Sequence, residues 1–133
     1  MTQERYGTNL IVSINYSHQL DDKAVIPPLS IYNLVENVIK HNIIDDRHQV
    51  ICTINVNSQF VIVSNNMFGK RNSFAKENSG IGLASLRKIY SMLSKTEVEI
   101  DIVGNFFIVK VPILQSHQTK GKIKLMAYEN CSR

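Results

Sequence analysis

The chain has 133 residues, of which 44% are hydrophobic and 20% are charged, and its formal net charge at pH 7 is +4. At this length one hydrophobic core buries roughly two thirds of the surface that the unfolded chain exposes, so the fold needs neither disulfides nor a structural metal. No apolar run approaches the roughly 18 residues of a membrane span, and no signal peptide follows Met1. We therefore expect a cytoplasmic domain with two free thiols, Cys52 in a strand and Cys131 in the tail.

The first third of the chain reads as a strand followed by a helix. Residues 9–16 place apolar side chains on alternate positions, which predicts a strand, and residues 17–23 form a polar connection. Pro27 and Pro28 then open a helical pattern, since proline is tolerated in a first helical turn. The apolar residues of this pattern recur at three- and four-residue spacing: Leu29, Leu34, Val35, Val38, Ile39 and Ile43.

A hairpin and a long loop come next. Residues 50–56 and 60–63 have strand composition and are joined by a turn at Asn57-Ser58, which predicts an antiparallel hairpin. Residues 65–79 are rich in Asn, Ser, Lys and Gly and predict an irregular loop. Loops of this length inside a compact domain are uncommon unless they serve a function.

The last part of the pattern is a second helix and a second hairpin. Gly80-Ile81-Gly82 opens the helix, and residues 97–103 and 106–111 form two strands around Gly104-Asn105. The whole order predicts a two-layer α/β sandwich over residues 1–114, in which helices cover one face of a mixed, mostly antiparallel sheet. Residues 115–133 form a polar, basic tail, in which residues 123–128 either add an edge strand or lack regular structure.

Two segments carry polar groups suited to a nucleotide. On the first helix, Asn37, Lys40 and His41 are predicted to share one face opposite the Leu34 and Val38 stripe. An amide oxygen with a nearby ammonium group suits Mg²⁺, which keeps several waters and bridges phosphates. Taken from the residues alone, an ordinary solvated helix face is the favoured interpretation, and position alone does not establish a metal site.

The second polar segment is the strand end at residues 61–66 together with the glycine-rich helix start at Ser79-Gly80-Ile81-Gly82-Leu83. Glycine lets the backbone approach a ligand closely, and the free N–H groups of a first helical turn attract phosphate. A single Gly-x-Gly is a weak signal. The signal is strengthened by the order of the segments. The Gly-x-Gly follows a polar helix face, a polar strand end and a loop that contains lysine and arginine.

These segments resemble known motifs. Residues 26–42, Ile-Pro-Pro-Leu-Ser-Ile-Tyr-Asn-Leu-Val-Glu-Asn-Val-Ile-Lys-His-Asn, resemble the N box of LytS-like sensor histidine kinases. Residues 79–83 resemble the G2 box of the GHKL superfamily, and residues 107–112 resemble the strand that closes many of its domains. The resemblance covers about residues 5 to 114 and implies the Bergerat ATP-binding fold with ATP and Mg²⁺ as cofactors.

The resemblance also implies roles for single residues. Asn37 would be the Mg²⁺ ligand, with Glu36 beside it and Lys40 near the phosphates as further catalytic residues. His41 would face the phosphates or ribose, and Asn65 would accept a hydrogen bond from the adenine amino group. Residues 67–79 would be the ATP lid, followed by the phosphate-side residues Gly80, Ile81, Gly82 and Leu83.

The sequence departs from the family pattern at several positions. Asn65 replaces the usual Asp, and its uncharged amide must be held with the oxygen facing the ligand. Met67 replaces the G1 glycine, and Ser85 and Ile89 stand where LytS-like members often have Asn and Arg. These changes motivate a second hypothesis, a degenerate GHKL module that serves regulation or protein interaction with weak or no ATP binding.

The leading hypothesis is the catalytic domain of a protein histidine kinase in a two-component system. Ser17-His18-Gln19-Leu20 superficially resembles a phosphoacceptor site, but it follows a strand in a polar connection with no long amphipathic helix around it. We therefore expect that the phosphoacceptor helices are missing from this chain. The isolated chain would therefore be inactive without the phosphoacceptor and dimerisation domain of a membrane-anchored parent, which would pass the phosphoryl group to a response regulator. We expect no membrane contact by this domain and no nucleic-acid partner, because aromatic residues do not interleave with the basic clusters at 70–76 and 120–124.

Overall fold

The computed structural model describes residues 7–16, 22–68 and 81–116 of the chain. Its main feature is a five-stranded sheet with strand order β1-β3-β4-β6-β5. A short 3-10 helix, η1 (Gly7–Asn9), precedes the first strand. The strands span β1 (Leu10–Tyr16), β3 (Val50–Val56), β4 (Phe60–Asn66), β5 (Glu99–Val103) and β6 (Phe106–Pro112). β1 pairs with β3 in parallel, and the other three pairings are antiparallel, as the sequence predicts for a mixed, mostly antiparallel sheet.

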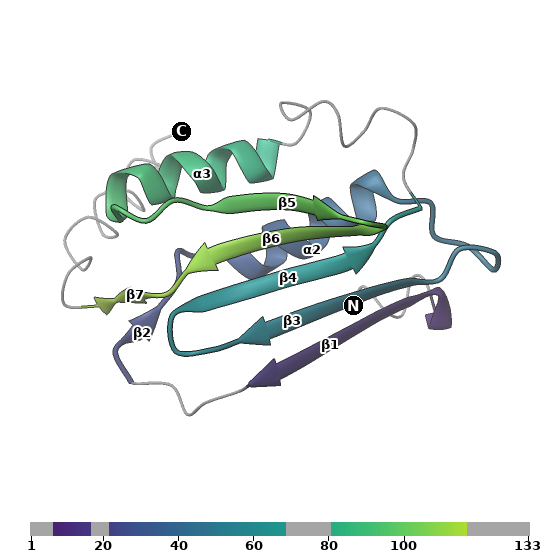
Figure 1. Cartoon of the computed structure of the whole chain (residues 1–133), viewed down its shortest axis with the longest axis horizontal. Coiled ribbons are helices and arrows are strands. Elements are labelled where there is room, and N and C mark those ends of the chain that lie inside the picture. Colours follow the sequence, from purple (N-terminus) through teal and green to yellow (C-terminus); the bar gives the residue numbers. More distant parts are fainter. Residues whose placement is uncertain (1–6, 17–21, 69–80, 117–133) are drawn as a thin grey trace.

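Two helices, α2 (Ser30–His41) and α3 (Ile81–Leu93), pack on the sheet, and α2 crosses behind it in Figure 1. Alternate residues of β3, β4 and β6 are buried, so one face of the sheet forms the core together with Leu34 and Val38 of α2 and Leu86 and Tyr90 of α3. This arrangement confirms the predicted two-layer sandwich. In the described ranges, neither helix is long and apolar enough to cross a membrane.

The prolines lie before α2 rather than inside its first turn. Leu29 has a φ of 63°, a left-handed conformation that ends the preceding segment, and the helix begins at Ser30. Both the backbone N–H and the hydroxyl of Ser30 donate to the carbonyl of Pro27, at 3.2 and 2.6 Å. The prediction that Pro27 and Pro28 belong to the helix is therefore wrong, because the left-handed residue interrupts the helical backbone.

Both predicted hairpins are present, and each turn has a local cause. Between β3 and β4, the side-chain oxygen of Asn57 accepts hydrogen bonds from the N–H groups of Gln59 and Phe60 at 2.8 and 2.7 Å. Between β5 and β6, Gly104 has a φ of 59°, which a residue with a side chain adopts only with strain. These turns fix the register of the strands that carry the site.

The structure adds elements that the sequence did not predict. β2 (Ala24–Val25) pairs antiparallel with β7 (Leu114–Gln115), which includes the first residue of the predicted tail. β4 continues through Asn65 and Asn66, so the predicted loop begins two residues too early. Residues 69–79 of that loop and the predicted edge strand at 123–128 lie outside the described residues.

Candidate functional site

Asn65 is a polar side chain on the core-facing side of the central strand. It follows Val61 and Val63 on the buried face of β4, and its residue is only 2% exposed. Its neighbours across the sheet are Cys52 and Phe107. The side-chain Nδ2 donates to the backbone carbonyl of Asn66 at 2.9 Å. Since a carbonyl can only accept, this bond fixes the amide orientation and leaves Oδ1 as the atom that can accept from a ligand.

The polar residues of α2 do not share one face. Asn37 and His41 are buried, 9% and 7% exposed, on the same side of the helix as Leu34 and Val38, whereas Lys40 is exposed. The prediction that Asn37, Lys40 and His41 lie together opposite the apolar stripe is therefore wrong. Asn37 follows Leu34 by three residues and His41 follows Val38 by three, which places both beside the buried stripe.

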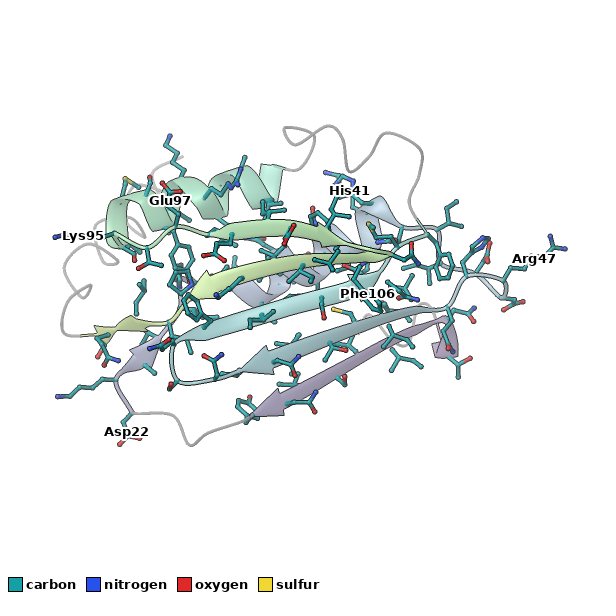
Figure 2. All side chains as sticks on the ribbon, in the orientation of Figure 1. Asp22, His41, Arg47, Lys95, Glu97 and Phe106 are labelled. Carbon is teal, nitrogen blue, oxygen red and sulfur yellow. The ribbon has the colours of Figure 1, made fainter. Side chains whose placement is uncertain are left out.

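Glu36 lies on the exposed side of α2. The hydroxyl of Tyr32, one turn earlier, donates to its carboxylate, and this hydrogen bond together with the negative charge of Glu36 raises the pKa of Tyr32. Glu36 thus engages an exposed neighbour on its own helix, away from the buried Asn37 amide. Figure 2 shows that His41, near the end of α2, lies at the same end of the molecule as Phe106, opposite Lys95 and Asp22.

The side-chain amide of Asn37 is the most suggestive polar group of the site. Asn37 as a residue is 9% exposed, and no hydrogen bond joins its amide to another residue of the described ranges. Among the described residues no buried side-chain nitrogen or oxygen lacks a partner, so the Asn37 amide is not an enclosed, unsatisfied group, and a ligand could bond to it where it reaches the surface. The described residues also contain no cluster of three acidic, cysteine or histidine side chains that could enclose a metal. One amide oxygen suits an ion such as Mg²⁺, which takes its remaining ligands from water and phosphate.

The start of α3 lies against α2. A Cβ atom built on Gly82 would lie 3.6 Å from Cβ of Asn33, one helical turn before Asn37. The first-turn N–H groups of α3 therefore lie close to α2, the helix that carries Asn37. Leu83 is half-buried and packs against the core, while Gly80 and the side chain of Ile81 lie outside the described residues.

Asn42, which the sequence analysis did not single out, connects the end of α2 to the segment after β4. Its Nδ2 donates to the carbonyl of Val38 at 2.8 Å, and its Oδ1 accepts from the backbone N–H of Phe68 at 2.8 Å. The N–H of Ile43 also donates to the carbonyl of Phe68 at 2.8 Å. The residue is 4% exposed, so these bonds are shielded from water. These hydrogen bonds join the end of the segment that resembles the N box, residues 26–42, to the start of the predicted ATP lid, residues 67–79.

Met67, the residue before Phe68, is bonded to the turn between β5 and β6. Its N–H donates to the carbonyl of Asn105 in the β5–β6 turn at 2.9 Å, and its half-buried side chain packs against the core. Met67 and Phe68 are thus bound to two separate elements. Met67, which stands where the resembled motif has a glycine, thus packs against the core.

Replacing Asn42 with alanine is expected to lower the free energy of unfolding by about 1–3 kcal/mol, because the half-buried N–H of Phe68 loses its acceptor. Asn66 provides a matched control, since its amide also makes two backbone bonds, to Ile51 N–H and Gln49 carbonyl, but it is only half-buried and both partners are exposed. Urea unfolding of N42A and N66A should show the larger loss for N42A. Equal losses would contradict the importance of burial at Asn42.

A tight turn at residues 45–48 lies next to this junction. Nδ1 of His48 is 2.7 Å from Oδ1 of Asp45, and the His48 ring packs edge-on against Phe68 with centroids 5.1 Å apart. The hydrogen bond from His48 and that from the Arg47 N–H lower the pKa of the Asp45 carboxyl. The turn thus places an ionisable pair beside the first residue after Met67.

The Asp45 carboxyl is expected to titrate below the ordinary aspartate range of about 3.9. Because folding lowers the pKa of Asp45, the Asp45–His48 pair stabilises the fold at pH values above the ordinary aspartate pKa. This contribution disappears as the pH falls through the lowered pKa of the folded state. A carbon-detected NMR titration of the Asp45 carboxyl should show the shift. In H48A the midpoint should move back toward the ordinary value, and an unchanged midpoint would contradict the role of His48.

No protein-family model matches the sequence, and no curated protein matches it. Several solved structures do match. The catalytic domain of histidine kinase ThkA is 16% identical, with a TM-score of 0.56 and coverage of 84% of each chain. The cytoplasmic segment of histidine kinase QseC is 19% identical, with a TM-score of 0.57 and coverage of 86% of this chain and 66% of that one. The Acinetobacter baumannii histidine kinase AdeS is 19% identical, with a TM-score of 0.52 and coverage of 86% and 59%.

These neighbours share the arrangement described above, a mixed sheet packed against helices over most of the chain. At this level of identity the likeness concerns the fold. The chain therefore has the fold of histidine kinase catalytic domains.

Proposed function

We propose that this chain is the ATP-binding catalytic domain of a LytS-like sensor histidine kinase. The observation that carries the proposal is the meeting of three predicted segments around α2. Asn42 and Ile43 bind Phe68 after β4, and Gly82 at the start of α3 approaches Asn33. Asn37, a buried residue whose amide bonds to no other described residue, lies on α2 between Asn33 and Asn42.

The residues present suit Mg-ATP. The amide oxygen of Asn37 would hold the metal, which would neutralise phosphate charge during phosphoryl transfer. Asn65 Oδ1, whose orientation is fixed by its bond to Asn66, would accept from the adenine amino group. The first-turn N–H groups of α3 would face the phosphates, with the exposed ammonium of Lys40 as a further cation.

The chain's part in the reaction is positioning and charge complementarity, because phosphoryl transfer requires little covalent chemistry from the protein. The receiving histidine would lie on a separate phosphoacceptor and dimerisation domain, and a response regulator would take the phosphoryl group from it. We also propose that the domain works in the cytoplasm, as part of a membrane-anchored parent kinase. Among the roles assigned from the resemblance, those of Glu36 and Lys40 rest on sequence position.

Titration of the full chain with Mg²⁺ and a non-hydrolysable ATP analogue tests the proposal. We expect saturable binding that shifts the side-chain amide NMR signals of Asn37 and Asn65. The matching GTP analogue should bind about tenfold more weakly or worse, because guanine presents a carbonyl oxygen where Asn65 requires a donor. Absence of saturable binding at millimolar nucleotide would overturn the proposal and favour a regulatory module that retains the fold without the ligand.

A further inference from the structure

The two side chains proposed to hold opposite ends of the nucleotide lie on different elements of the fold. Asn37 is on α2, and Asn65 is near the end of β4. α2 packs on the sheet through apolar side chains such as Leu34 and Val38. Apolar packing is non-directional, so by itself it does not fix where α2 lies along the sheet. A nucleotide that bonds to both amides gains most when the distance between them is fixed.

The side chain of Asn42 supplies a directional link between these two elements. Its Nδ2 donates to the carbonyl of Val38 at 2.8 Å, and Val38 directly follows Asn37. Its Oδ1 accepts from the N–H of Phe68 at 2.8 Å, three residues beyond Asn65. Asn42 is only 4% exposed, so water competes little for either bond. One amide thus bridges the backbone close to each proposed ligand group.

The segment that receives this link is itself fixed to the sheet. The side chain of Asn66 bonds to the backbone around the start of β3, and the N–H of Met67 bonds to the turn between β5 and β6. The N–H of Ile43 donates to the carbonyl of Phe68 at 2.8 Å, beside the bond from the Asn42 amide. The end of α2 is therefore tied to a segment that separate hydrogen bonds hold to the sheet.

We propose that Asn42 is a positioning residue of the nucleotide site, which sets the distance between the metal-binding amide of Asn37 and the adenine-binding amide of Asn65. The inference rests on the proposed function, since it assigns no ligand of its own to Asn42. Both ends of the Asn42 amide bond to backbone groups, so the residue acts through α2 and β4 rather than by touching the nucleotide. Two sites held at a fixed distance bind a ligand that spans them more tightly than its separate fragments.

Fragments of the nucleotide test this role in the full chain. Adenosine occupies only the Asn65 side, Mg²⁺ with tripolyphosphate occupies only the Asn37 side, and a non-hydrolysable ATP analogue with Mg²⁺ spans both. In N42A each fragment should keep its wild-type affinity within about twofold, because each local site is intact, whereas the analogue should bind about 10-fold more weakly. The side-chain amide NMR signals of Asn37 and Asn65 report the binding at each side.

Two variants separate positioning from loss of stability. N57A removes two backbone hydrogen bonds in the turn at the opposite end of β4, and it should leave the affinities for the analogue and both fragments unchanged. N42D keeps an oxygen for the N–H of Phe68, so the analogue should bind more tightly relative to the fragments than it does in N42A. Repulsion between the new carboxylate and phosphate would weaken tripolyphosphate and the analogue alike, so it cancels from this comparison.

The outcomes distinguish the role of Asn42 from the proposed function. Wild-type affinity for the analogue in N42A would overturn the positioning role and leave nucleotide binding by the chain intact. An equal loss for the analogue and for one fragment would also overturn it, since Asn42 would then belong to a single local site. An equal loss in N57A would assign the effect to stability. Absence of analogue binding by the wild-type chain would overturn the proposed function, and the role of Asn42 with it.

Discussion

Replacing Asn37 with alanine is expected to weaken Mg²⁺-dependent nucleotide binding by about 10- to 150-fold, the loss of about 1.5–3 kcal/mol that follows removal of a ligand to a charged group. Because no residue in the described ranges bonds to this amide, the fold should lose little stability. Calorimetric titration with and without EDTA would separate the metal-dependent part of the affinity. In N37A the two titrations should coincide.

Two variants make the Asn37 experiment selective. N37D keeps an oxygen at the same position and should retain metal-dependent binding. E36Q changes the exposed neighbour that bonds to Tyr32, and it should leave nucleotide affinity unchanged. If N37A binds nucleotide with the affinity and metal dependence of the wild type, Asn37 is not a ligand of the metal. That result would leave the proposed nucleotide binding by the chain intact.

Replacing Tyr90 with alanine is expected to lower the free energy of unfolding by about 3–5 kcal/mol, a large share of the stability of a small domain. Tyr90 is fully buried, and its hydroxyl donates to the carbonyl of Pro112 at 2.7 Å. Y90F keeps the ring but leaves that carbonyl unpaired, for a loss of about 1–3 kcal/mol. Y16F, at a 66% exposed position, should change little.

Urea unfolding at two pH values would check the Tyr90 assignment. Burial raises the pKa of Tyr90, so the folded state keeps the hydroxyl protonated. Its contribution is complete below the unfolded tyrosine pKa of about 10 and falls progressively as the pH rises above it. Y90F lacks this dependence, so the difference between Y90F and the wild type should narrow above about pH 10. A loss in Y90F below 0.5 kcal/mol at neutral pH would contradict the role of the hydroxyl.

The elements predicted correctly from the sequence have local causes. The Asn57 turn and Gly104 mark both hairpins, and alternating apolar residues mark their strands. β2 and β7 could not be predicted, because two-residue strands show no alternation and depend on a partner about 90 residues away. The exact start of α2 depends on the left-handed backbone at Leu29, which has no sequence signal in a leucine.

The site residues named from the sequence stay predictions, while the structure tests where they lie. Motif resemblance identified Asn37 and Asn65, and the structure buries both. The prediction that Asn37 lies opposite the Leu34 and Val38 stripe was wrong, because the buried face of α2 is wider than that stripe and includes Asn37. Asn42 was missed because its role depends on Phe68, which is 26 residues away in the sequence and has no recognisable spacing from it.

The parallel pairing of β1 with β3 has a consequence for how the chain folds. Leu10 is paired with Val50, so this contact closes a much longer stretch of chain than either hairpin does. Long-range pairings form late, since the entropy of closing the loop is lost before the contacts are gained. We therefore expect V12A in β1 to accelerate unfolding with little change in the refolding rate, and V63A in β4 to slow refolding as well. Stopped-flow measurements would show β1 pairing with β3 after the β3–β4 hairpin has formed. The β4–β6 pairing, which closes at least as long a stretch of chain, is also expected to form after the hairpins.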